Sequence, residues 1–295
     1  MNDILNGLAE GEYKIIRRFN PGTDARISGI PAFNPRIAIC LDTETTGMNY
    51  PADKIVELAM IAVEYEASTG QISRILDMYE SFEYPGMPIP AEATAVNGIT
   101  DDMVRGMKFD DDRVNEMVGK AHILVAHNSR FDRKYLEARF PVFASKPWAC
   151  TLTQIDWAAE KMATKSLEFL LYKNGFFVDA HRAMADTQGV VALLLCTLPV
   201  SGELASAVML AKARAKSWKI FAIDSPFDMK DVLRGRGYSW FAGGDGKQKA
   251  WFKDVSDKDA ELEFLAAEVY PHGTNMSKVL VHEVDAYSRF SAREP

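Results

Sequence analysis

The sequence predicts an α/β protein with a mixed sheet flanked by helices, followed by a small α+β domain. Three runs of apolar and β-branched residues lie between positions 36 and 82 and are joined by short turns, which predicts an antiparallel meander. Short apolar runs then alternate with segments of helical period, as is typical of α/β proteins. Residues 199–202 (PVSG) mark a boundary, and a segment of different character follows.

The first domain is expected at residues 36–200, after an N-terminal arm at residues 1–35. In the arm, residues 13–19 could form a short strand or helix, and residues 20–35 are a loop rich in Gly, Pro and Asn. Apolar runs predict the strands, and the 3.6-residue period predicts the helices. The expected strands are 36–41, 54–65, 72–82, 122–126 and 148–151, and the expected helices begin at 91 or cover 110–120, 129–140, 152–162, 166–174 and 184–198.

The second domain is expected at residues 203–295. A helix at 203–217, a strand at 218–223 and a helix at 226–234 precede a hairpin formed by 238–241 and 249–255, and a helix at 257–270 closes the domain. Residues 243–246 (GGDG) predict the hairpin turn. Trp240 and Trp251 would face each other across the hairpin, either as domain core or as a platform on which single-stranded bases stack. The region is locally basic, with Lys212, Arg214, Lys216, Lys219, Arg234, Arg236, Lys247 and Lys249.

Net charge, cysteine spacing and the lengths of the apolar runs argue against several classes of protein. The net charge of −7 argues against a protein that coats duplex DNA with a broad basic surface. Three widely spaced cysteines, Cys40, Cys150 and Cys196, predict a reducing, cytoplasmic compartment rather than a disulfide framework. Residues 1–19 lack the apolar stretch of a signal peptide, and the longest apolar run, 190–200, is too short to span a bilayer. We therefore expect no membrane association.

Two carboxylates follow the first strand of the meander. In residues 41–47 (LDTETTG), Asp42 and Glu44 are two residues apart, so both side chains fall on one face of a strand. Two like charges so placed repel each other unless a cation lies between them. Carboxylate oxygens favour Mg²⁺ or Mn²⁺. A polar turn at a strand end is the alternative interpretation.

Two further motifs place aspartates near helix starts. Residues 127–132 (HNSRFD) follow a strand and bring Asp132 into the first or second turn of a helix. Residues 181–186 (HRAMAD) bring Asp186 to the start of an apolar helix, with His181 on the preceding loop. Taken singly, an aspartate at a helix start is explained by the helix dipole, and a lone histidine by a surface position.

The three motifs together resemble the DEDDh family of 3′→5′ exonucleases, which includes bacterial proofreading subunits and ribonuclease T and has a ribonuclease H-like fold. The family motifs are similar to LDTETTG, HNxxFD and HxAxxD, and the resemblance covers residues 36–198. Residues 96–100 (VNGIT) resemble a family segment that reads HGIT, with Asn97 in place of the histidine, which leaves the contacts of that loop open. Residues 223–253 resemble a small module appended to bacterial primases, helicases and exonucleases.

The resemblance implies a two-metal hydrolysis of phosphodiester bonds at the 3′ end of single-stranded DNA. It implies two divalent cations, Mg²⁺ or Mn²⁺, with Asp42 shared between them, Glu44 and Asp186 completing the site, Asp132 acting through metal-bound water and His181 as general base. Contacts to the terminal nucleotide are expected from residues around these motifs: Thr45, Gly47, Met48, His127, Asn128 and Phe131. For Phe131, core packing is the alternative.

Two rival functions stay open from the sequence. One is an RNA 3′ exonuclease of the ribonuclease T or oligoribonuclease type, because recognition of the 2′-OH cannot be identified in a sequence. The other is a non-catalytic nucleic-acid-binding module that kept the fold. The sequence shows no separate polymerase domain, so a proofreading role would need a polymerase or another replication or repair protein as partner.

Overall fold

The computed structural model describes residues 13–179, 181–244, 248–270 and 275–293. The start of the expected arm and residues 245–247 of the expected hairpin turn, with Lys247, lie outside these ranges. The chain divides into two compact units, Met1–Ala213 with Phe290–Ala292, and Arg214–Arg289 with Arg293–Pro295. The first unit thus extends past the boundary expected at residue 200, and a short C-terminal segment also belongs to it.

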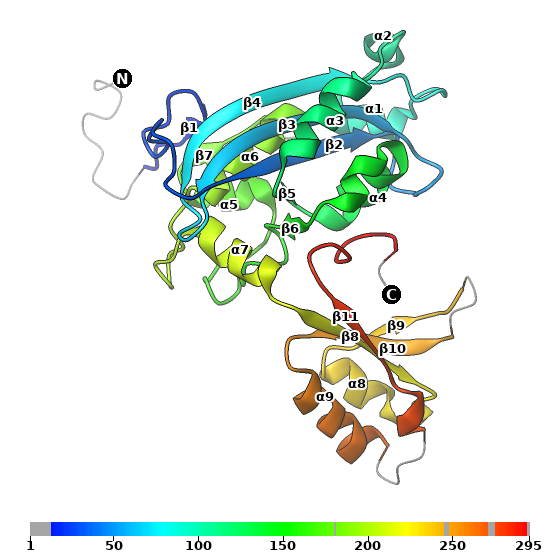
Figure 1. The fold of residues 1–295 in the computed structure, drawn as a ribbon. Coiled ribbons are helices and arrows are strands. Elements are labelled where there is room, and N and C mark those ends of the chain that lie inside the picture. The colour runs from blue at the N-terminus through cyan, green and yellow to red at the C-terminus, as the bar shows by residue number, and fades with distance from the viewer. Residues whose placement is uncertain (1–12, 180, 245–247, 271–274, 294–295) are drawn as a thin grey trace. The chain divides into compact units, whose positions relative to one another are not determined.

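A five-stranded mixed sheet forms the centre of the first unit, in the order β4-β3-β2-β5-β6 (Figure 1). The meander β2 (Pro35–Thr45), β3 (Ile55–Glu66) and β4 (Ile72–Phe82) is antiparallel, as the sequence predicted. Strands β5 (Ile123–Ala126) and β6 (Trp148–Cys150) add to β2 in parallel. The mixed α/β architecture expected from the sequence is confirmed.

Both faces of the sheet are buried, and the strands alternate between two apolar cores. On β2, Ala38 and Cys40 face one core, while Ile39 and Leu41 face the other. The first core is closed by α5 (Leu167–Lys173), α6 (Ala183–Leu194) and α7 (Ala205–Arg214). The second is closed by α3 (Asp111–Lys120) and α4 (Ser129–Arg139) (Figure 1). Helices can therefore bring side chains to β2 from either side.

Smaller elements complete the first unit. Helices α1 (Ala91–Asn97) and α2 (Asp101–Val104) follow β4, and a 3₁₀ turn, η1 (Pro141–Ser145), follows α4. In the arm, β1 (Arg17–Arg18) pairs in parallel with β7 (Phe176–Phe177). The buried ring of Phe19 packs edge-on against Phe176, which anchors the arm in the first core.

The helix expected at residues 152–162 is wrong, because this segment forms a series of turns. The Gln154 side chain accepts a hydrogen bond from the Cys150 backbone N–H, and the Trp157 indole donates one to the Thr151 carbonyl. Lys161 adopts a left-handed φ of 59°. Side-chain hydrogen bonds to the backbone thus accompany the turns that replace the expected helix.

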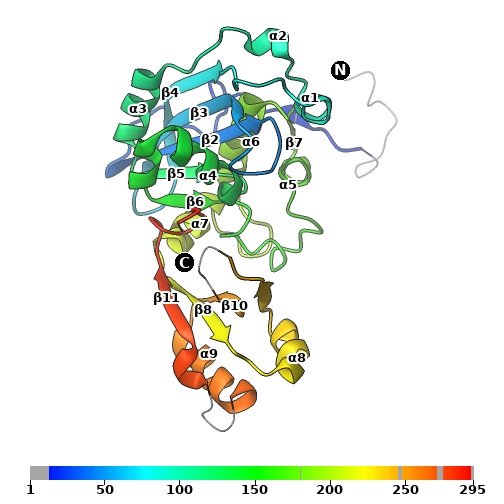
Figure 2. The same cartoon turned by 90° about the vertical axis from the view of Figure 1, so that its right-hand side faces the viewer.

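The second unit is an antiparallel sheet with helices on one face. Strands β8 (Ser217–Ile223), β9 (Ser239–Phe241), β10 (Ala250–Val255) and β11 (Leu280–Val284) are arranged in the order β11-β8-β10-β9 (Figure 2). Two short 3₁₀ turns, η2 (Phe227–Met229) and η4 (Met276–Lys278), precede α8 (Lys230–Gly235) and β11. Helix α9 (Lys258–Phe264) continues as a π-helical turn, Leu265–Val269. The sequence did not predict β11.

The two tryptophans of the hairpin have different environments. Trp240 and Trp251 are paired across β9 and β10, with ring centroids 5.5 Å apart. Trp251 packs against the apolar core of the second unit, whereas Trp240 is 52% exposed. Core packing thus accounts for Trp251, and the stacking of single-stranded bases stays a prediction for Trp240.

Among the described residues, no helix combines the length and apolar character needed to cross a membrane.

Replacing each of two helical glycines by alanine should change the stability in opposite directions, because only one of them is closely packed. A Cβ on Gly189 of α6 would lie 2.9 Å from Leu171 Cδ1 and 3.2 Å from Leu167 Cδ2, whereas a Cβ on Gly119 of α3 would meet no atom within 4 Å. We expect Gly189→Ala to lower the free energy of unfolding by about 1–3 kcal/mol through overpacking. Gly119→Ala, the control, should raise it by about 0.5–1 kcal/mol through helix propensity. Urea unfolding measures both, and a stabilised Gly189→Ala would contradict the close packing of α6.

Candidate metal centre

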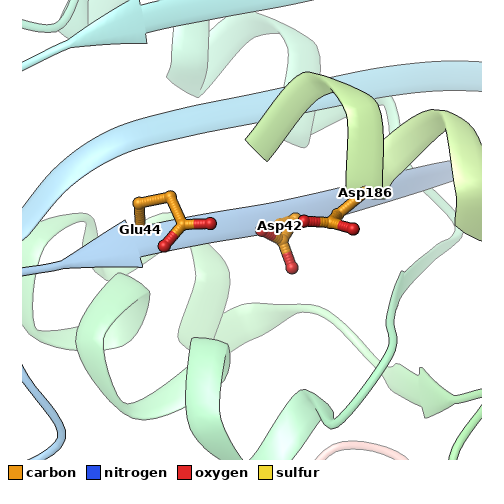
Figure 3. Close-up of side chains that lie close together, drawn as sticks. All are labelled: Asp42, Glu44 and Asp186. Atoms are coloured by element: carbon orange, nitrogen blue, oxygen red, sulfur yellow. The ribbon is translucent and has the colours of Figure 1, made fainter. Parts of the chain in front are cut away.

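Three carboxylates converge where the C-terminal end of β2 meets the first turn of α6. Asp42 and Glu44 continue the face of β2 that Ala38 and Cys40 turn toward α6, and Asp186 comes from that helix. One carboxylate oxygen from each of the three residues can be chosen so that all lie within 4.8 Å of one another. Figure 3 shows the three side chains gathered between strand and helix. Alternation along a strand therefore places two ligand candidates beside a third.

Asp132 reaches the same strand end from the opposite face of the sheet. It lies on α4 and is only 2% exposed. Its Oδ1 accepts hydrogen bonds from the Thr43 backbone N–H at 3.1 Å and from Thr43 Oγ1 at 2.8 Å. Asp132 is therefore fixed by the residue between Asp42 and Glu44, and it stands outside the group of three convergent carboxylates. The sequence did not single out Thr43.

Burial raises the pKa of each of these acids, and repulsion by neighbouring carboxylates of the site adds to it for Asp42, Glu44 and Asp132. For Asp42 the pKa lies well above its usual range, first because of burial and then because of the charges of Asp132 and Asp186. Burial followed by the charge of Asp186 raises the pKa of Glu44 to about 7. Burial is also the largest cause for Asp132, with a pKa of about 7, and for Asp186, with a pKa of about 6. The cluster resists ionisation without a compensating cation.

His181 lies beside the cluster with an exposed side chain. Its backbone has a left-handed φ of 65°, and its N–H donates a hydrogen bond to Asp186 Oδ2 at 2.8 Å. The ring is therefore attached to the same short segment as Asp186. The structure brings His181 next to a carboxylate of the cluster through its backbone.

The loop after β2 carries three of the expected substrate contacts. Thr45 is buried, and its Oγ1 donates a hydrogen bond to the Gly47 carbonyl at 2.6 Å. A Cβ on Gly47 would lie 2.6 Å from Asp53 Oδ2, so the turn leaves no room for a side chain there. Met48 is 76% exposed. Of the three, Met48 has an exposed side chain, while Thr45 and Gly47 shape the loop.

In the second motif, residues 127–132, the His127 ring serves the internal structure of the protein. His127 accepts from Thr151 Oγ1 through Nδ1 (2.8 Å) and donates through Nε2 to the Lys165 carbonyl (2.9 Å), because a carbonyl can only accept. Burial lowers its pKa to about 4. Both ring nitrogens are thus engaged within the protein. Asn128 is exposed at the N-terminus of α4, with φ of 81°.

Phe131 is partly a core residue, and its contact with the terminal nucleotide stays a prediction. It is half-buried against the second core, and its ring lies 5.2 Å from that of Tyr135. Packing therefore accounts for part of its surface, and the rest is accessible.

Asn97 supports the strand end from α1. It is buried, its Nδ2 donates to the Thr45 carbonyl at 3.4 Å, and its Oδ1 accepts from the Ile99 N–H at 3.0 Å. A hydrogen bond from its side chain also favours the ionised form of Glu44 and so lowers the pKa of that acid. Asn97, which stands where the family segment has histidine, thus supports both the end of β2 and the ionised form of Glu44.

Chemically, the cluster fits a divalent cation with a preference for oxygen ligands. Its donors are carboxylate oxygens that lie within 4.8 Å of one another, and neither cysteine sulfur nor a histidine ring belongs to the group. The charges of neighbouring carboxylates contribute to the raised pKa of Asp42 and of Glu44, as expected of like charges held together for a cation. The described residues contain no other such group of three or more ligand candidates.

Comparison with known families identifies the first unit. The exonuclease family model RNase_T matches residues 39–194, which include all three motifs. The chain belongs to this exonuclease family. The enzyme class expected from the sequence is therefore confirmed, and the carboxylate cluster lies inside the family's domain.

Individual relatives of this exonuclease cover only part of its chain. The DNA polymerase III PolC-type proteins of Bacillus cereus and Bacillus subtilis are each 30% identical to it, over 53% and 56% of the chain. The matched segments make up only 11% and 12% of those relatives. Among solved structures, E. coli exonuclease I in complex with a DNA oligonucleotide matches with a TM-score of 0.51 at 16% identity, covering 75% of this chain and 63% of that one. This last likeness shows the fold. No comparison specifically supports the module resemblance of the second unit.

The raised pKa values predict how stability of the metal-free exonuclease depends on pH. Between the usual pKa of a carboxyl group and the raised one, the folded state binds more protons than the unfolded state, so unfolding becomes easier as pH rises. We expect the melting temperature in EDTA to fall between pH 5 and pH 8, as Asp186 and Glu44 lose protons near pH 6 and 7. Glu44→Gln should flatten this fall, and Glu116→Gln, a surface change on α3, should not. A pH-independent melting temperature would contradict the electrostatics of the cluster.

Proposed function

We propose that this member of the exonuclease family removes nucleotides from the 3′ end of single-stranded DNA with the help of two divalent cations. The convergence of Asp42, Glu44 and Asp186 at one strand end carries this proposal. Repulsion makes such a cluster costly unless a cation occupies it. A phosphodiester backbone is a substrate that such cations can bind and polarise.

The residues of the site have distinct roles in this proposal. Asp42, Glu44 and Asp186 would hold the cations, with Asp42 central to both, as the family resemblance implies. Asp132, held by Thr43, acts through the surrounding water shell. The cations supply an activated water and stabilise the charge that develops on the phosphate and on the leaving oxygen.

His181 takes the proton of the attacking water. Imidazole suits this role because it titrates near neutral pH. The His181 ring is exposed, and the backbone N–H of the same residue donates a hydrogen bond to Asp186. The base and a cation ligand therefore lie on one short segment. The exposed Met48 and the accessible part of Phe131 would contact the terminal nucleotide through apolar surface.

The names of the relatives favour DNA over RNA as substrate. The PolC-type relatives are DNA polymerases, and exonuclease I was solved with a DNA oligonucleotide. A replication or repair role with a polymerase as partner is consistent with the PolC relation. The second unit is proposed as an accessory domain that follows the exonuclease domain.

The activity is tested with 5′-labelled single-stranded DNA and RNA of the same sequence, incubated with Mn²⁺, Mg²⁺ or EDTA. We expect a ladder that shortens from the 3′ end, requires the metal and is faster on DNA. Asp42→Ala should abolish it because the shared cation ligand is lost. Asp77→Ala on β4, which breaks an ion pair with Arg113 of α3, is the matched control and should keep the activity. Absence of cleavage with either sugar and any metal would refute the proposal.

His181→Ala separates the base from the cation ligands. We expect turnover to fall by about 10²–10⁴-fold, because a positioned general base contributes that much. Stabilisation of the fold by Mn²⁺, measured as a rise in melting temperature, should persist because the carboxylates remain. Unchanged turnover would show that another group accepts the proton.

A further inference from the structure

Glu57 is a buried carboxylate beside the metal centre that no motif marks. It lies in the middle of the sheet on β3, directly opposite Glu44 of β2, and is 0% exposed. Its charge adds to the repulsion that raises the pKa of Asp42 and of Glu44. A carboxylate placed here is unfavourable for the cluster by charge alone, so its presence calls for another reason.

The contacts of Glu57 lead to the start of α6. Its Oε1 accepts a hydrogen bond from Arg182 Nη2 at 2.9 Å. Its Oε2 accepts from the Ala183 backbone N–H at 3.1 Å and from Arg182 Nε at 3.4 Å. The side chain thus satisfies one of the N–H groups that every helix start leaves unpaired, and it binds the guanidinium of the N-cap residue as well.

This anchor sits within the segment that carries both His181 and Asp186. Arg182 follows His181 directly, and its carbonyl accepts the Asp186 N–H at 3.0 Å. Thr187, one turn further, donates its hydroxyl hydrogen to the Ala183 carbonyl at 2.7 Å, within α6 itself. The first turn of α6 is therefore held by β3, while the residues that it presents face the end of β2.

We propose that Glu57 and Arg182 are positioning residues, which fix the first turn of α6 so that Asp186 and His181 meet the cluster on β2. The inference rests on the proposed function of this site and adds two residues to it. Partners that orient metal ligands typically change metal affinity or activity by about 10–100-fold when they are replaced.

A loss of local charge and a loss of the position of α6 predict different outcomes when Glu57 and Arg182 are replaced. Replacing Glu57 removes a negative charge near the cluster, whereas replacing Arg182 removes a positive charge that interacts with Glu44. By charge alone, Glu57→Gln and Arg182→Gln would shift the affinity for a cation in opposite directions. Loss of position predicts that both variants bind the cation more weakly.

The same strand offers a matched control. Glu64 of β3 also binds an arginine with both oxygens, Arg74, and also accepts a backbone N–H, that of Ala32. This pair connects β3 with β4 and the arm and has no part in the cluster. Glu64→Gln therefore reproduces the loss of a two-pronged ion pair on β3 without touching α6.

The test measures Mn²⁺ affinity by calorimetry, and kcat and KM on single-stranded DNA, in the full chain. We expect Glu57→Gln and Arg182→Gln both to lower Mn²⁺ affinity and kcat by roughly 10-fold or more without a matching rise in KM. Arg182→Lys keeps the charge but not the two-pronged contact, so it should show a smaller loss of the same kind. Glu64→Gln should leave Mn²⁺ affinity and kcat at the wild-type level.

The following outcomes would contradict the positioning role or the proposed function. Opposite shifts of Mn²⁺ affinity in the Glu57 and Arg182 variants, or no shift in either, would overturn the positioning role. Equal losses in Glu64→Gln would reduce it to general stability and overturn it as well. A wild-type protein that binds Mn²⁺ but cleaves no DNA would refute the proposed function, while the affinities would still test the role of the pair.

Discussion

Repulsion among carboxylates at the end of β2 is the constraint on which the organisation of this exonuclease depends. Asp42, Glu44 and Asp186 converge there, Asp132 approaches from the opposite face of the sheet, and burial raises the pKa of each. Such a group is held together only by a fold that fixes each side chain through other contacts. The hydrogen bonds from Thr43 to Asp132 and from His181 to Asp186 provide this fixation in the absence of any cation.

A sheet covered on both faces makes this arrangement possible. Because side chains alternate along β2, Asp42 and Glu44 face α6 while Thr43 faces α4. Each helix contributes one aspartate from its first turn, where the helix dipole favours a negative charge. The two apolar cores therefore do more than stabilise the domain, since their helices determine where the third and fourth carboxylates lie.

The sequence predicted the parts of this site whose signals are local. Two-residue spacing placed Asp42 and Glu44 on one face of a strand, helix starts placed Asp132 and Asp186, and only the resemblance of the three motifs to one family joined the four acids into one expected site. The alternation of strands and helices predicted the sheet. Glu57 was not identified from the sequence because it lies in the apolar run KIVELAMIAVEY. An acidic residue within such a run is usually explained as a polar position of a strand. Residues 152–162 were wrongly expected to be helical, because the hydrogen bonds that the Gln154 and Trp157 side chains make with the backbone leave no mark on the apolar period of the sequence.

The start of α6 shows why such long-range contacts escape a sequence. Within six residues it holds a base candidate, an arginine bound to β3 and a cation ligand, and each is tied to the next through the backbone. The His181 N–H is used by Asp186, so the position of the ring and that of the carboxylate vary together. A displacement of this turn would move His181 and Asp186 together, and its attachment to a central strand makes the position of both residues depend on the sheet.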